Sequence, residues 1–142
     1  MQVRAATPDE LDACAALYAR VAAETFTWRS TAEMTPNAFL KQAAAEEVYV
    51  AVEDGQVAGL LALYRPDAFI HSLFVDGRSR GVGRALLEHV EGLDPRRRLS
   101  LKVESANQRA VAFYKREGFR RVGRGVDAYG EWLLLRREKA GV

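Results

Sequence analysis

A glycine-containing turn joins two stretches of different hydrophobic pattern near the middle of the chain. Residues 67–75 are β-branched and aromatic and short enough for a strand, whereas apolar residues recur at helical spacing from Val82. Backbone N–H groups at the start of a helix lack partners and lie at the positive end of its dipole. Gly81 and Gly83 carry no Cβ atoms that would keep an anion away from those groups. The turn therefore predicts a site for a pyrophosphate.

Positive side chains surround the same turn, because Arg78, Arg80 and Arg84 flank the two glycines. An ordinary strand-to-helix turn with solvated arginines fits this short motif about equally well, since short glycine motifs often arise by chance. The turn is also not a dinucleotide-binding fingerprint, because G-x-G-x-x-G is absent. A second motif has to decide between the two interpretations.

That second motif spans residues 107–119, which read Asn-Gln-Arg-Ala-Val-Ala-Phe-Tyr-Lys-Arg-Glu-Gly-Phe. Together with Arg-x-x-Gly-x-Gly at 78–83, it resembles the GCN5-related N-acetyltransferases, the GNAT superfamily. The acyl-CoA loop of that family reads Gln/Arg-x-x-Gly-x-Gly/Ala, and its second signature reads Asn-x-x-Ala-x-x-Phe-Tyr-x-x-x-Gly-Phe. Two motifs in the right order are far more specific than either alone. The resemblance covers about the last two-thirds of the chain and implies an acetyl-CoA-dependent N-acetyltransferase.

The resemblance also implies which residues contact acetyl-CoA, the expected cosubstrate. In the family, the pantetheine arm runs along the end of the fourth strand, and the pyrophosphate lies at the loop and the following helix. The corresponding residues of this chain are Leu73, Phe74, Val75, Arg78, Ser79, Arg80, Gly81, Val82, Gly83 and Arg84, with Asn107 and Tyr114 from the second signature. The loop is shorter than in most members, so we expect a tight turn in which Gly77 supplies unusual backbone angles.

Tyr114 occupies the position of a tyrosine that acts as general acid in family members. A phenol with an ordinary pKa of ~10 is protonated at neutral pH and can donate a proton to a departing thiolate. The resemblance therefore implies that Tyr114 is catalytic. The alternative is that Tyr114 only packs beside Phe113.

The base that accepts the proton of the amine is less well defined. Many relatives carry a glutamate where this chain has Phe69, and His71 follows on the same strand and face. Histidine has an ordinary pKa of ~6.5, which suits proton transfer, although a lone histidine in a central strand is more often structural. We expect His71 to be the base, with Glu24 and Glu104 as the reserve candidates.

The acceptor pocket in the family is lined by the connection between the first two helices. The resemblance therefore implies that Glu24, Phe26 and Trp28 contact the substrate, together with His71. Anchoring of the two aromatic side chains on the core is an equal alternative. We expect the acceptor to be a primary amine of a small molecule or a peptide.

The elements that must position these residues follow from local patterns. Residues 7–10, Thr-Pro-Asp-Glu, form a capping box before a helix, and Thr35-Pro36 begins a second helix that extends to about Glu46. Asp54-Gly55 is a two-residue hairpin turn. The order is β-α-α-β-β-β-α-β-α-β-β, which is also the order of the family. We predict one α/β domain over residues 1–142, a mixed, mostly antiparallel sheet flanked by helices.

The composition argues against several other functions. The net charge of +2 over 142 residues is too small for a general polyanion binder, so we expect no nucleic-acid partner. The run Arg96–Arg98 could touch the adenosine 3′-phosphate or nucleic acid, but a solvated loop is the better interpretation. No apolar run approaches the ~18 residues of a membrane span, and the start lacks a signal-peptide pattern. The single Cys14 cannot form an intrachain disulfide.

We therefore expect a cytoplasmic monomer or homodimer that does not contact membranes. No His/Cys cluster has the spacing of a zinc site, so we also expect no metal. A function of another class stays open. A non-catalytic acyl-CoA-binding sensor or interaction module would use the same fold, and the absence of a glutamate at Phe69 is compatible with it.

Overall fold

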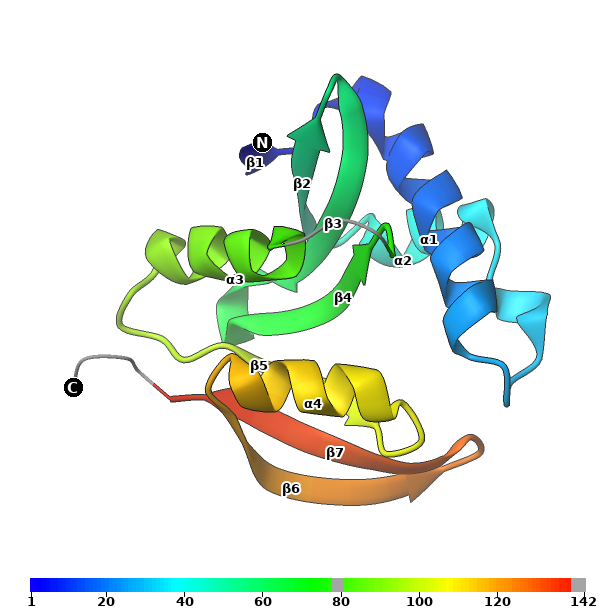
Figure 1. Ribbon diagram of the computed structural model, residues 1–142, viewed down its shortest axis with the longest axis vertical. Helices are drawn as coiled ribbons and strands as arrows, with labels where there is room; N and C mark the ends of the chain where they lie inside the picture. Colours follow the sequence, from blue (N-terminus) through cyan, green and yellow to red (C-terminus); the bar gives the residue numbers. More distant parts are fainter. Residues whose placement is uncertain (78–80, 139–142) are drawn as a thin grey trace.

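The computed structural model describes residues 1–77 and 81–138. These residues form a seven-stranded sheet with the strand order β1-β2-β3-β4-β5-β7-β6 (Figure 1). The strands are β1 (Gln2–Ala5), β2 (Glu47–Glu53), β3 (Gln56–Tyr64), β4 (Phe69–Val75), β5 (Ser100–Glu104), β6 (Phe119–Asp127) and β7 (Gly130–Arg137). Among the described strands, only β4 and β5 pair in parallel, so the predicted mixed, mostly antiparallel sheet is confirmed.

Helices cover both faces of this sheet. They are α1 (Leu11–Thr25), α2 (Pro36–Ala43), α3 (Val82–Leu93) and α4 (Gln108–Arg116). Successive side chains of a strand point to opposite faces. Val50 and Leu60 pack with residues of α1 and α2, whereas Tyr49 and Leu61 pack with residues of α3 and α4. The first two helices therefore lie on one face, and the last two lie on the other face, as Figure 1 shows.

Several local predictions are confirmed by the backbone. The Thr7 N–H donates to Glu10 Oε1 at 2.9 Å at the start of a short 3-10 turn that leads into α1. The Glu10 carboxylate also accepts from Arg4, and this bond is the main reason that its pKa falls to about 2. Asp54 and Gly55 both have positive φ, +52° and +77°, as a two-residue hairpin turn requires.

One predicted boundary is wrong. The second helix ends at Ala43 rather than near Glu46, because β2 begins at Glu47 and the Glu46 side chain turns inward to His71. At the other end of the chain, pairing of β6 with β7 continues until Asp127 meets Gly130.

Strands β4 and β5 separate soon after they begin to pair. Their register contains only Phe69 with Ser100 and Ile70 with Leu101. Beyond that point, β4 remains paired with β3 as far as Val75, and β5 remains paired with β7 as far as Glu104. The two halves of the sheet therefore diverge and leave one edge of β4 without a neighbouring strand.

The free edge of β4 carries the backbone groups of alternate residues. The Asp76 N–H donates to the Ala58 carbonyl of β3 at 2.8 Å. Residues next to a hydrogen-bonded pair turn their backbone groups to the opposite edge. The N–H and C=O groups of Val75 and Leu73 thus face the opening between β4 and β5.

None of the helices in the described ranges has the length and apolar character of a membrane span.

Candidate active site

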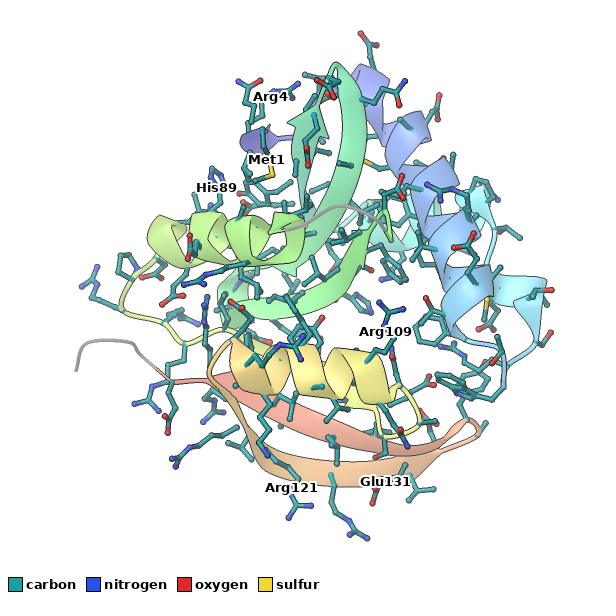
Figure 2. All side chains as sticks on the ribbon, in the orientation of Figure 1. Met1, Arg4, His89, Arg109, Arg121 and Glu131 are labelled. Carbon is teal, nitrogen blue, oxygen red and sulfur yellow. The ribbon has the colours of Figure 1, made fainter. Side chains whose placement is uncertain are left out.

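A cavity of about 890 Å³ occupies the opening between β4 and β5. Its walls come from the end of α1 and the loop that follows it, from both strands, and from the first turns of α4. This volume is typical of sites for small molecules. Ten of the predicted site residues line it, namely Glu24, Phe26, Trp28, His71, Leu73, Phe74, Val75, Gly83, Asn107 and Tyr114. Arg109, which sequence reasoning missed, also lines this cavity from α4 (Figure 2).

Other predicted residues lie elsewhere. Arg78, Ser79 and Arg80 fall outside the described residues. Gly81 and Val82 stand at the start of α3, where Val82 is buried in the core. The exposed Arg84 side chain lies along α3 and donates from Nε to Glu88 Oε1 at 3.1 Å. Neither Gly81, Val82 nor Arg84 lines the cavity.

The two glycines of the turn have different structural roles. Gly81 is the N-cap of α3 and has a φ of +76°, a left-handed conformation that favours glycine. Gly83 is buried, and a Cβ atom there would lie 2.9 Å from Phe113 Cζ of α4. We expected both glycines to open the turn to an anion. The structure gives Gly83 a further role, because the absence of a Cβ atom there permits close packing of α3 on α4.

The prediction for Gly77 is wrong. Its φ is outside the left-handed range, and the turn acquires its positive φ at Gly81 instead. The first intrahelical bond of α3 runs from the Ala85 N–H to the Gly81 carbonyl at 3.0 Å. The N–H groups that precede Ala85 have no acceptor within the helix. The start of α3 can thus still donate to an anion, and the pyrophosphate site stays a prediction.

Replacing Gly81 with valine is expected to weaken acetyl-CoA binding by at least about tenfold, about 1.4 kcal/mol. A β-branched residue is strained at a φ of +76°, so the turn and the first N–H groups of α3 must move. Calorimetric titration with acetyl-CoA measures the change.

Gly55→Val is the matched control, because Gly55 has a φ of +77° in the turn between β2 and β3, far from the cavity. It should lose similar stability to heat and keep the affinity for acetyl-CoA. A folded Gly81→Val protein that binds as tightly as the wild type would remove the turn from the binding site.

Tyr114 is a buried member of the core that still reaches the cavity. Its ring lies edge-on to Phe113 and to Phe119, with centroid distances of 5.2 and 5.3 Å. Burial raises the pKa of Tyr114 well above its ordinary value. The phenol therefore keeps its proton throughout the neutral and mildly alkaline range and is available as a donor. Tyr114 also packs against Phe113, as the alternative interpretation holds, and its contacts with Phe113 and Phe119 fix the position of the ring.

His71 forms a pair with a carboxylate that sequence reasoning assigned only to the end of a helix. Nδ1 of His71 lies 3.0 Å from Glu46 Oε2. The imidazole is 50% exposed, whereas the Glu46 side chain is 4% exposed. Phe69 lies beside the imidazole with ring centroids 6.2 Å apart. No local signal predicts the pair, because the two residues are 25 positions apart.

Glu104, one reserve candidate for the base, has both carboxylate oxygens engaged. Trp28 Nε1 donates to Oε2 at 2.6 Å, and Arg29 Nη1 donates to Oε1 at 2.9 Å. These bonds tie the loop after α1 to the end of β5. Glu24, the other reserve, is exposed on the last turn of α1 at the cavity wall. Glu104 thus holds the loop after α1 in place, a structural role that the sequence did not predict.

The aromatic loop satisfies both of the alternatives open for it. Phe26 packs edge-on against Trp28 and Phe74, at centroid distances of 5.6 and 6.3 Å, and the three side chains also line the cavity. Sequence reasoning missed Arg29, whose guanidinium lies over the ring of Phe26 at 4.9 Å and over that of Tyr129 at 4.1 Å. Anchoring of this loop and formation of the cavity wall are therefore one arrangement.

Comparisons with known proteins agree with this geometry. A model of the acetyltransferase (GNAT) domain matches residues 14–134. The chain is 36% identical over 108 residues to the peptidyl-lysine N-acetyltransferase YjaB of Escherichia coli, covering 73% of this chain and 69% of that protein. It is 31% identical over 97 residues to the 5-NmdU N-acetyltransferase of Pseudomonas phage PaMx11, covering 64% of this chain and 68% of that protein.

The fold agrees as well. The solution structure of the apo form of YjaB from Escherichia coli matches with a TM-score of 0.78 and 29% identity. The match covers 99% of this chain and 98% of that one. The resemblance on which the sequence prediction rests is confirmed by the match of the domain model and by the agreement of the fold. The chain therefore belongs to the GNAT family of acetyltransferases.

Proposed function

We propose that this protein transfers the acetyl group of acetyl-CoA to a primary amine of a small molecule or peptide, by direct attack of the amine on the thioester. The observation that carries the proposal is the divergence of β4 from β5. It exposes the backbone groups of Leu73 and Val75 to a cavity that Tyr114 and His71 also line. Donors for an extended amide chain, a proton donor and a proton acceptor thus share one space.

The residues present fit acetyl-CoA. The pantetheine arm carries amide groups that can pair with the free edge of β4 as an added strand would. The pyrophosphate is an anion, and the start of α3 offers N–H groups beside Gly81 that have no acceptor within the helix. A backbone N–H of the β4 edge can also stabilise charge that develops on the thioester carbonyl oxygen.

The proposed transfer needs two proton movements in addition to the attack. His71 accepts a proton from the ammonium form of the acceptor, which leaves a neutral amine with a free electron pair. The amine nitrogen forms a bond to the thioester carbon, and the bond from carbon to sulfur breaks. Tyr114 gives its proton to the departing thiolate, and the nitrogen loses its second proton to solvent. Tyr114 then regains a proton from solvent and His71 releases one to it, which restores the starting state. The products are an amide and the thiol of CoA.

The class of acceptor rests on the relatives and on the shape of the cavity. One relative is named a peptidyl-lysine N-acetyltransferase and the other a 5-NmdU N-acetyltransferase. A peptidyl-lysine acceptor and a 5-NmdU acceptor are therefore both represented among similar chains. The wall made by Phe26 and Trp28 suits the aliphatic part of an alkyl amine.

A panel of amines tests the proposal directly. The protein is incubated with acetyl-CoA and lysine-containing peptides, amino acids, polyamines or aminoglycosides, while the free thiol of CoA is measured and the product is identified by mass spectrometry. We expect acceptor-dependent release of CoA with one added acetyl group on a primary amine. Binding of acetyl-CoA without acetyl transfer to any primary amine would contradict the proposal.

A further inference from the structure

A second cavity of about 480 Å³ lies beside the proposed active site, and His71 belongs to both. The residues that line the second cavity include two carboxylates, Glu46 and Asp67, and two aromatic side chains, Tyr64 and Phe69. Lys102 also lines it. The Lys102 ammonium lies 4.3 Å from the centroid of the Trp132 ring. The space therefore combines two carboxylates with aromatic side chains, a composition that favours an organic cation.

Glu46 has an unusual environment for a carboxylate in this space. Its side chain is 4% exposed, and Oε2 lies 3.0 Å from His71 Nδ1. The other oxygen, Oε1, is buried and has no hydrogen-bond partner among the described residues. A buried acceptor without a donor destabilises the protein unless something else supplies the bond. An N–H group of a bound substrate would supply it.

We propose that Glu46 is a positioning residue for His71 and that its Oε1 atom binds the ammonium group of the acceptor, which reaches the thioester through the second cavity. The proposal rests on the proposed function, because it takes His71 as the base. It goes further by naming the residue that recognises the ammonium group and the route by which the acceptor enters.

The hydrogen bond to Glu46 determines which nitrogen of His71 is free. An ionised carboxylate only accepts hydrogen bonds, so Nδ1 of a neutral His71 must carry the hydrogen. Nε2 then has the free electron pair and can accept a proton. The other charged or titratable groups that line the second cavity with His71 are Glu46 from the connection between α2 and β2, Lys102 from β5, Asp67 and Tyr64. Of these, Glu46 is the one within hydrogen-bond distance in the described residues.

The proton transfer follows from this arrangement. The acceptor ammonium donates one N–H to Glu46 Oε1 and releases another proton to His71 Nε2, directly or through one water. The imidazolium that forms is stabilised by the carboxylate at 3.0 Å. The amine that remains is neutral and lies at the boundary between the two cavities, where it can attack the thioester.

Two variants separate the two roles of Glu46. Glu46→Gln keeps a carbonyl oxygen for the His71 N–H but has no charge for an ammonium, whereas Glu46→Ala removes both functions. Glu47→Ala is the control, since Glu47 is the next residue and bonds instead to Tyr49 and Arg65, outside the first cavity and the second. Thermal melting and the affinity for acetyl-CoA report whether each variant is folded.

The first measurement needs no activity. Nitrogen NMR of labelled histidine reports which ring nitrogen carries the hydrogen, and His89 on α3 is an internal reference. We expect the Nδ1–H form of neutral His71 in the wild type and in Glu47→Ala, and loss of that preference in Glu46→Ala. An unchanged Nδ1–H preference in Glu46→Ala would overturn the positioning role.

The second measurement is the kinetics of acetyl transfer to N-α-acetyl-lysine amide, a primary alkyl amine. For Glu46→Gln we expect the KM for this amine to rise about tenfold or more, the size of one charge-assisted hydrogen bond. For Glu46→Ala, kcat should also fall, by about 10- to 100-fold, as is typical when the partner that orients a functional histidine is lost. An unchanged KM in Glu46→Gln would overturn the ammonium site. If His71→Ala left turnover unchanged, His71 would not be the base and this inference would fail with it, whereas the amine panel tests acetyl transfer independently.

Discussion

Replacing Tyr114 with phenylalanine is expected to lower kcat by about 10²–10⁴-fold, the usual contribution of a general acid. The change removes only the hydroxyl oxygen, so the contacts of the ring with Phe113 and Phe119 should persist. Affinity for acetyl-CoA should change less than a few-fold, because the phenol acts mainly on charge that develops during the reaction. Single-turnover rates and calorimetric titration of both proteins measure the two effects.

Tyr49→Phe is the matched control for this variant. Tyr49 is also buried, and its hydroxyl donates to Glu47 at 2.5 Å, away from the cavity. That control should lose some stability and keep the wild-type rate. If Tyr114→Phe retained more than half of the wild-type single-turnover rate, Tyr114 would be a packing residue and not the acid.

The raised pKa of Tyr114 also determines how kcat should depend on pH. Burial favours the neutral phenol, so ionisation occurs above the ordinary value of ~10. A general acid is active in its protonated form. Any loss of kcat between pH 7 and about 10 should therefore come from another group, and wild type and Tyr49→Phe should show the same alkaline behaviour.

Replacing His71 with alanine is expected to lower kcat/KM for an alkyl amine by about 10²–10⁴-fold near pH 7. The wild-type protein can take the proton from the ammonium form itself, so its kcat/KM should depend only weakly on the fraction of neutral amine in solution. In the variant only neutral amine from solution can react, so its kcat/KM should keep rising with pH as that fraction increases. The defect should therefore shrink as pH increases. Profiles of kcat/KM against pH for the two proteins measure this difference.

His89→Ala is the control, since the ring of His89 lies on α3, 5.4 Å from the ring of Tyr49 and outside the cavity. Its profile should match that of the wild type. If His71→Ala showed the wild-type profile, the base would lie elsewhere. Glu24 would then be the stronger remaining candidate, because Trp28 and Arg29 already occupy both oxygens of Glu104.

The sequence predicts the local structure and the family well, because the responsible signals act between neighbouring residues. The capping pair Thr7 and Glu10 and the Asp54-Gly55 turn each depend on backbone groups within a few positions. The signature at 107–119 is a continuous stretch of one helix and the turn that follows it. Such features form largely independently of the rest of the chain, so the order of elements and the position of Tyr114 can be read without coordinates.

The tertiary structure alone decides which of these residues share a cavity and what each of them contacts. Glu46 meets His71 across 25 positions, and Trp28 meets Glu104 across 76, through side-chain geometry that leaves no periodic trace in the sequence. The requirement for glycine at position 83 likewise comes from Phe113, a residue of another helix. Such contacts depend on how helices pack and on where β4 and β5 cease to pair. The reason is physical: local backbone preferences determine the elements, whereas side chains distant in sequence determine the chemistry of the site only once packing has brought them together.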